Sequence, residues 1–220
     1  MGLVLKLFVA LPGILLALTI HEFSHAYSAY LMGDPTAKYE GRLTLNPVKH
    51  IDPIGGLLLL LTTLFGGGMT FGWAKPVPIN PYNFRNAQDG TLITSLAGPV
   101  SNLIAAALCG LLFRLGIIPL HPTEENLFIQ ILYLFVFIFL QVNIGLAIFN
   151  LIPIPPLDGS KVLYGLLPTE LAYKYSVFER KYAFFLPLIF VILIASNMLN
   201  FILFPFYSFF FKLFTGIPLF

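Results

Sequence analysis

The sequence predicts an all-α polytopic membrane protein, and three observations lead to this fold class. Of its 220 residues, 58% are hydrophobic and only 10% are charged, whereas soluble domains carry about 25% charged residues. A helix needs about 20 apolar residues to cross a hydrocarbon core, and four segments of the chain are long and apolar enough to do so. The polar stretches between them are shorter than a domain, which takes about 50 residues or more. We therefore expect one membrane-embedded domain over 1–220.

We expect the four spans at about 3–31, 92–115, 127–152 and 183–211. The first apolar run continues without a small-residue cleavage site, which predicts a retained span and not a signal peptide. A further apolar stretch, 54–65, is too short to cross and has Pro and Gly at its flanks. It predicts a re-entrant or interfacial segment. Short extended segments are expected within 35–85.

The distribution of positive charge predicts the orientation of these spans. With four spans, the segments 32–91 and 153–182 lie on one side of the membrane. That side holds Lys38, Arg42, Lys49, Lys75, Arg85, Lys161, Lys174, Arg180 and Lys181. The opposite side has only Lys6, Arg114 and Lys212. By the positive-inside rule the first side is cytoplasmic, and both termini lie outside. A spanning helix at 54–65 would blur this asymmetry.

The composition also excludes some functions. The net charge is +2 and the charges are scattered, so nothing indicates a nucleic-acid partner. The single cysteine, Cys109, lies in an apolar stretch and is interpreted as a small packed residue.

The most informative motif is His21-Glu22-Phe23-Ser24-His25, near the end of the first span. Two histidines four residues apart share one face of a helix, so both imidazoles can point at one metal ion. In this H-E-x-x-H spacing the glutamate is a base that takes a proton from a metal-activated water. The motif therefore predicts metal-assisted hydrolysis inside a membrane.

A second polar motif follows the third span, where Pro153, Pro155 and Pro156 break the helix just before Asp158. Asp158 could be an ordinary helix N-cap. The broken backbone favours a site, because free backbone groups at membrane depth are tolerated only in protein or beside a water-filled cavity. Both motifs reach the same membrane face, so Asp158 can supply the third protein ligand that catalytic zinc usually has.

The remaining polar residues have simpler interpretations. Gly98 and Pro99 indicate close helix packing at the second span, where Asn102 could instead hydrogen-bond a substrate backbone. Interhelical hydrogen bonds are expected for Gln141, Asn143, Asn197 and Asn200. Structural polar contacts are expected for His50 and Asp52.

Together these residues resemble the site-2 proteases, and in particular the compact prokaryotic members without PDZ or CBS domains. The resemblance covers most of 15–165. It rests on the motifs His21–His25, Gly41–Pro47, Trp73–Pro78, Gly98–Asn102 and Asn150–Gly159. Ser160 stands where the family often has a second glycine.

The resemblance implies an intramembrane zinc metalloprotease in a prokaryotic cell membrane. The charge asymmetry predicts that its active site lies towards the cytoplasm. The resemblance also implies one zinc ion held by His21, His25 and Asp158, with Glu22 as base and proton shuttle. Asn150 is implied near the substrate or oxyanion, and Asn102 as a substrate contact. The implied partners are a transmembrane protein substrate and the lipid bilayer.

Two other classes remain open at the level of the sequence. A metal transporter also carries ligands on helices, but it needs polar residues along a route through the bilayer, and here they gather at one end. A catalytically silent protein that binds transmembrane helices would not need the His, Glu, His and Asp set. The segment 66–81 could hold an unwound substrate as an added strand, within the limits that Pro76, Pro78 and Pro81 set.

Overall fold

The structure is a computed structural model that describes residues 3–65, 72–119, 126–186, 188, 192–193 and 198–218. Helices joined by turns make up this part of the chain, and the described residues form no β-strand. Their one isolated β-bridge pairs Ile51 with Ala74 in antiparallel fashion. The all-α prediction is confirmed.

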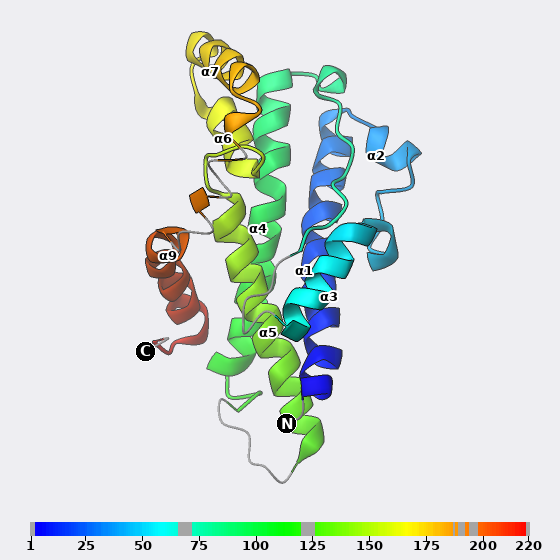
Figure 1. Cartoon of the computed structure of the whole chain (residues 1–220), viewed down its shortest axis with the longest axis vertical. Helices are drawn as coiled ribbons and strands as arrows, with labels where there is room; N and C mark the ends of the chain where they lie inside the picture. Colours follow the sequence, from blue (N-terminus) through cyan, green and yellow to red (C-terminus); the bar gives the residue numbers. More distant parts are fainter. Residues whose placement is uncertain are drawn as a thin grey trace.

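Three long helices form the centre of the molecule: α1 (Leu3–Met32), α4 (Ala87–Arg114) and α5 (Leu127–Asn150). They lie side by side in Figure 1, with α4 running opposite to α1 and α5. Each is long and apolar enough to cross a membrane. The first three predicted spans are therefore confirmed as helices, and the chain is an integral membrane protein.

The start of α4 differs from its prediction at residue 92. The helix begins at Ala87, because the side chain of Asn86 caps it by accepting hydrogen bonds from the amides of Gln88 and Asp89. The first turn of the helix is polar and precedes the apolar run. The hydropathy pattern therefore located the apolar part of the helix and missed this turn. The helix α5 ends at Asn150, two residues before its predicted end at 152.

The helix α3 (Pro53–Phe65) is the apolar stretch that the sequence predicted as re-entrant or interfacial. Its 13 residues span about 20 Å at about 1.5 Å per residue, less than a hydrocarbon core of about 30 Å. In Figure 1 it crosses obliquely beside α1. The bridge between Ile51 and Ala74 brings the chain after α3 back beside the chain before it. This geometry is compatible with a re-entrant or an interfacial segment, which stays a prediction.

Two residues before and at the start of α3 have the structural roles predicted for them. The side chain of Asp52 accepts hydrogen bonds from the amides of Ile54 (3.0 Å) and Gly55 (2.8 Å). The ring Nε2 of His50 lies 2.8 Å from the carbonyl of Thr44, to which it donates. Both side chains are used in holding this turn together.

The described chain also contains shorter helices: α2 (Thr36–Tyr39), η1 (Pro47–His50), η2 (Pro81–Asn83), α6 (Asp158–Leu166), α7 (Thr169–Lys181) and α9 (Met198–Thr215). The predicted fourth span, 183–211, lies partly on 187, 189–191 and 194–197, outside the described residues. Its described part differs in its limits, because α9 begins at Met198 and continues past 211. The apolar part of α9, Phe201–Thr215, is shorter than the three long helices.

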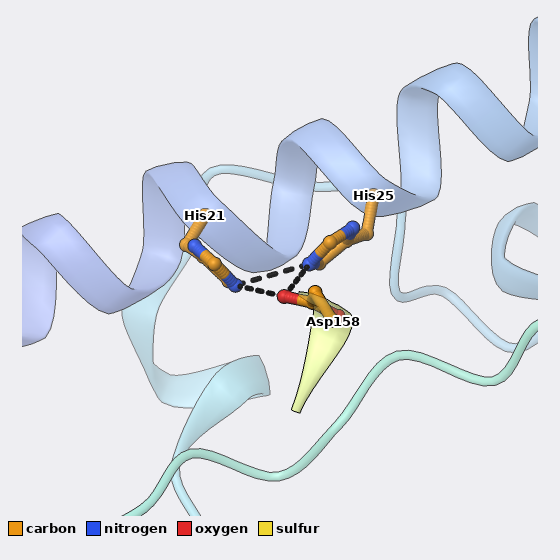
Figure 2. Close-up of side chains that lie close together, drawn as sticks. All are labelled: His21, His25 and Asp158. Carbon is orange, nitrogen blue, oxygen red and sulfur yellow. Dashed lines mark hydrogen bonds and ion pairs between the residues drawn. The ribbon is translucent and has the colours of Figure 1, made fainter. Parts of the chain in front are cut away.

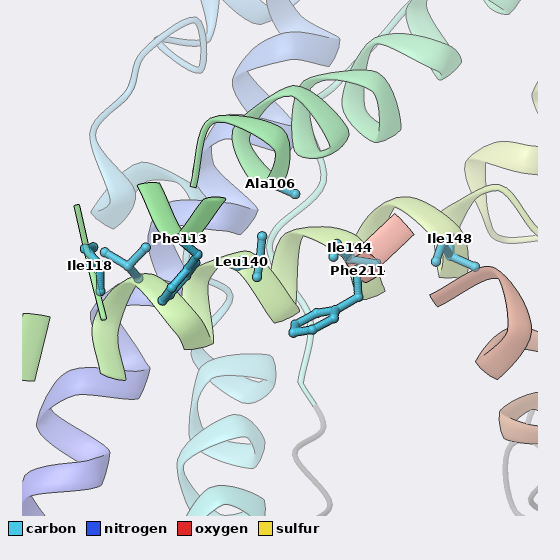
Figure 3. Packing of buried hydrophobic residues seen from close by; sticks show 8 residues of the cluster. Ala106, Phe113, Ile118, Leu140, Ile144, Ile148 and Phe211 are labelled. Carbon is cyan, nitrogen blue, oxygen red and sulfur yellow. The ribbon is translucent and has the colours of Figure 1, made fainter. Parts of the chain in front are cut away.

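The largest apolar core lies where α4, α5 and α9 meet. Ala106 and Phe113 of α4 pack there against Leu140 and Ile144 of α5 and Phe211 of α9 (Figure 3). At Gly110 an added Cβ would lie 2.6 Å from the Cβ of Phe214, so glycine allows α9 to approach α4 closely. Cys109 packs against this core, as the sequence predicted.

Candidate active site

Two histidines of α1 and one aspartate of α6 converge on one point (Figure 2). His21 and His25 lie one helical turn apart, and their Nε2 atoms are 3.0 Å from each other. The Oδ2 atom of Asp158 is 3.1 Å from each of these nitrogens. The histidines are 5% and 6% exposed. The structure thus brings together the three residues that the sequence predicted as metal ligands.

The chain reaches this point with Asp158 because α5 stops short of it. After Asn150 the backbone forms turns through 151–157, and Asp158 is the first residue of α6. Gly159 lets the new helix start close to the end of the old one, since an added Cβ there would clash with the carbonyl oxygens of Leu151 and Ile152. This break between the two helices therefore allows the carboxylate to lie beside the histidines of α1.

The other ring nitrogen of each histidine is held by a hydrogen-bond acceptor. The Nδ1 atom of His25 lies 2.7 Å from the backbone carbonyl of Thr94. A carbonyl can only accept, so this nitrogen carries the proton. In the neutral ring Nε2 then has a free lone pair that points towards Asp158.

The same reasoning applies to His21, whose Nδ1 lies 2.6 Å from Oδ1 of Asn102. The amide of Asn102 has this orientation because its Nδ2 donates to the carbonyl of Ala17 (3.2 Å) and to Oδ1 of Asn143 (2.7 Å). Asn143 in turn donates to the carbonyl of Phe139. A chain of buried amides thus fixes the ring of His21.

Three electron-pair donors therefore face one another at short range, an arrangement that a cation would stabilise. Nitrogen and oxygen ligands about 2.0–2.2 Å from tetrahedral zinc lie about 3.3–3.6 Å apart, close to the 3.0–3.1 Å between these atoms. The donor set fits zinc.

The site has no room for a side chain at Gly98 of α4. An added Cβ would lie 2.7 Å from Cε1 and from Nε2 of His21, and it would clash with Nε2 of His25. The close packing that the sequence predicted at this glycine is therefore confirmed, and it brings α4 directly against the two rings.

Glu22 lies on the neighbouring face of the same helical turn. Its Oε2 accepts a hydrogen bond of 2.9 Å from the backbone amide of Val77. Glu22 lines a cavity of about 460 Å³ together with His21, His25 and Asp158. The carboxylate is thus placed to exchange a proton with a water or substrate beside the metal ligands.

A second, apolar cavity of about 790 Å³ lies between α1, α5 and α9. Its walls include Gly145 of α5 and Phe204 of α9. Leu18, Gly72, Leu146 and Phe149 line both cavities. An apolar space inside the helix bundle is therefore directly adjacent to the cavity that Glu22 lines, the candidate catalytic cavity.

Asn102 and Asn150 were both predicted near the substrate, and the structure places them differently. Asn150 lines the catalytic cavity and donates to the carbonyl of Leu146 (2.9 Å). Asn102 is fully buried, and His21, Ala17 and Asn143 occupy its amide. In this geometry Asn102 orients the ring of His21 and does not face the cavity as a substrate contact would.

Sequence reasoning did not identify the carbonyl of Thr94 or the amide of Val77. Both are backbone groups, which carry no sequence signal of their own. Asn143 was expected as an interhelical hydrogen-bonding residue, and its contact with Asn102 confirms that.

Comparisons with known proteins agree with this geometry. The model of Peptidase family M50 matches residues 114–196. The "Putative zinc metalloprotease YwhC" of Bacillus subtilis is 38% identical over 193 residues, which are 87% of this chain and 82% of that protein. The "Putative zinc metalloprotease Rip2" of Mycolicibacterium smegmatis is 36% identical over 162 residues, 73% of this chain and 56% of that protein. The protein of the same name from Mycobacterium tuberculosis is 35% identical over 153 residues, 70% of this chain and 55% of that protein. No solved structure matches. The chain therefore belongs to Peptidase family M50, the site-2 protease family of intramembrane zinc metalloproteases.

Proposed function

We propose that this chain is an active zinc endopeptidase that hydrolyses peptide bonds in or near transmembrane segments of membrane proteins. His21, His25 and Asp158 hold one zinc ion, and Glu22 is the general base. The observation that carries the proposal is the convergence of three ligand atoms within 4.8 Å of one another, with the carboxylate of Glu22 on the same helical turn as the two histidines.

Zinc in such a site lowers the pKa of a water from about 15.7 towards 7 and polarises a carbonyl. The protein supplies the remaining parts of the reaction. Glu22 takes the proton from the attacking water and delivers it to the leaving nitrogen. The hydrogen bond from Val77 occupies Oε2 of Glu22, which leaves Oε1 for this exchange.

The adjoining cavities support a transmembrane substrate. A membrane helix hides its peptide carbonyls in its own hydrogen bonds, so it must unwind locally before attack. The apolar cavity offers a surface that an apolar segment can occupy, and its shared wall with the catalytic cavity brings an unwound bond towards the ligands. Asn150 lines the catalytic cavity and is proposed to bind the substrate near the oxyanion.

The orientation follows from the charges. The catalytic residues lie at the end of the bundle that carries most of the lysines and arginines, so we propose that the site opens towards the cytoplasm of a prokaryotic cell.

The variant Glu22→Gln tests the reaction. It keeps the size of the side chain but cannot take up the proton, so we expect cleavage to fall by at least about 10²-fold. The measurement uses purified protein in proteoliposomes and a panel of single-span proteins carrying a fluorescent pair across the membrane segment. Zinc content should stay near one ion per chain.

Two results would contradict the proposal. One is cleavage by Glu22→Gln at close to the wild-type rate. The other is a wild-type protein that cleaves no member of the panel and moves zinc across liposomes, which would favour a transporter.

A further inference from the structure

We infer that Asp34 and Arg42 are positioning residues that hold the segment 74–80 against α1, so that the amide of Val77 fixes the carboxylate of Glu22. The inference rests on the proposed role of Glu22 as general base. Neither residue touches the metal ligands.

The segment 74–80 lies along the catalytic cavity in an extended conformation. Ala74, Pro76, Val77 and Ile79 line that cavity. A hydrogen bond of 2.9 Å from the amide of Val77 to Oε2 of Glu22 links the segment to the proposed general base. Whatever fixes the segment therefore also fixes the position of Glu22.

Asp34 anchors the end of the segment that follows Val77. Its side chain is fully buried just after the end of α1. Oδ2 accepts a hydrogen bond of 2.7 Å from the amide of Asn80. Oδ1 accepts from Nδ2 of Asn83 at 2.7 Å and from the amide and hydroxyl of Thr36. One carboxylate thus joins the end of α1, the start of α2 and the turn after the segment.

A charged carboxylate is needed at this position because every partner is a donor. Burial alone would raise the pKa of Asp34, but these hydrogen bonds outweigh it and lower the pKa. An asparagine would place an amide N–H against at least one of the donors. Removing an acceptor from a buried donor costs its full desolvation penalty, so the attachment of Asn80 would weaken.

Arg42 anchors the end of the segment that precedes Val77. It is 5% exposed, and its Nη2 donates to the carbonyl of Lys75 at 2.6 Å. The amide of Lys75 donates in turn to the carbonyl of His50 at 2.9 Å, next to the bridge between Ile51 and Ala74. The segment is therefore fixed on both sides of Val77, while Val77 itself packs against Ala26 and Ala37.

The test compares Asp34→Asn with Asp89→Asn in zinc-loaded protein. Asp89 is exposed on the first turn of α4 and contacts Asn86, away from the segment. The substrate is the single-span reporter that wild type cleaves fastest. For Asp34→Asn we expect kcat to fall by about tenfold or more. The fall should not exceed the about 10²-fold that complete loss of a positioned base costs. Zinc content should equal that of wild type. Asp89→Asn should retain wild-type kcat.

Amide hydrogen exchange separates positioning from a general loss of fold. In Asp34→Asn the amides of Val77 and Asn80 should exchange faster by about tenfold or more, while those of 8–32 keep wild-type protection. Should Asp34→Asn misfold, Asn83→Ala removes one donor at an exposed turn and should loosen the same two amides. Unchanged exchange at Val77 and Asn80 in both variants would overturn the inference.

The link between the segment and Glu22 has its own test. Val77→Pro removes the amide donor, and its neighbours Pro76 and Pro78 already favour the extended backbone that proline adopts. Val77→Ala keeps the donor. We expect kcat to be about tenfold lower in the proline variant than in the alanine variant, with equal zinc content. Equal kcat values would overturn the inference.

These outcomes are separable from those of the proposed function. If wild type cleaves no reporter, the protease proposal fails, and the exchange measurements still decide whether Asp34 holds the segment. If wild type cleaves and the exchange and kcat of Asp34→Asn match wild type, only the positioning role fails.

Discussion

Each candidate zinc ligand of α1 is held from behind by an acceptor on α4. For His25 that acceptor is the carbonyl of Thr94, and for His21 it is the amide of Asn102. Such contacts fix the ring orientation and raise ligand basicity, and losing one typically lowers metal affinity about 10–100-fold. The two histidines therefore depend on the packing of α4 as much as on their own helix.

Asn102→Ala should weaken zinc binding by about 10–100-fold, because Nδ1 of His21 loses its acceptor. The measurement is zinc retention against a series of chelator concentrations. Ser101→Ala serves as the matched control, since its hydroxyl bonds only to the carbonyl of Gly98 on its own helix. Wild-type chelator resistance in Asn102→Ala, with the fold intact by circular dichroism, would contradict the role given to this amide.

The sequence predicted His21, His25 and Asp158 as one cluster, and the chemistry of their side chains explains why this prediction was possible. Imidazole and carboxylate groups in an apolar chain have few other uses, so their spacing is informative. The function of Asn102 could not be read in the same way. Its partners depend on how α4 is rotated against α1, and neither helix encodes that rotation in a local pattern.

Among the elements, α5 has two faces that serve different purposes. One face packs into the core with α4 and α9 through residues such as Leu140 and Ile144. Another lines the apolar cavity through Val142, Gly145 and Leu146. An added Cβ at Gly145 would meet no atom within 4 Å, so a larger side chain there would extend into the cavity and leave the packing intact.

Gly145→Leu should therefore hinder a transmembrane substrate without disturbing the metal. Overpacking a bound segment typically costs about 1–3 kcal/mol, so we expect kcat/KM for the single-span reporter to fall about 5- to 160-fold with zinc content unchanged. Gly145→Ala fills far less space and should have a smaller effect. If the leucine variant cleaves the reporter as wild type does, the substrate does not use this cavity.

The predicted limits of the elements differ in accuracy for physical reasons. Hydropathy located both ends of α1 and α5 to within two residues. It missed the first turn of α4, where a cap and not hydrophobicity starts the helix. A re-entrant or interfacial α3 was predicted from its length, but the pairing of Ala74 with Ile51 is one that no periodicity indicates.

On the scale of the whole molecule, both ends of the described chain lie at the same end of the bundle. The helix α4 runs opposite to α1, and Nη1 of Arg114 at its end donates to the carbonyl of Leu213 (3.1 Å) near the end of α9. The start of α1 lies at that same end in Figure 1. The sparse positive charges of this end, which include Arg114 and Lys212, contrast with the opposite end, where 32–52 and α7 lie.

This arrangement predicts the labelling of single cysteines by a membrane-impermeant reagent in a Cys109→Ser background. Exposed Lys49, Arg85 and Lys174 should share one pattern, because a re-entrant or interfacial α3 would leave all three positions on one side of the membrane. Lys212, exposed near the end of α9, should give the opposite pattern. In intact cells we expect only the cysteine at 212 to react, because the positive-inside rule places the other three in the cytoplasm. Labelling of 49 and 85 from opposite sides would mean that α3 crosses the membrane, and reaction of all three from outside would reverse the proposed orientation of the active site.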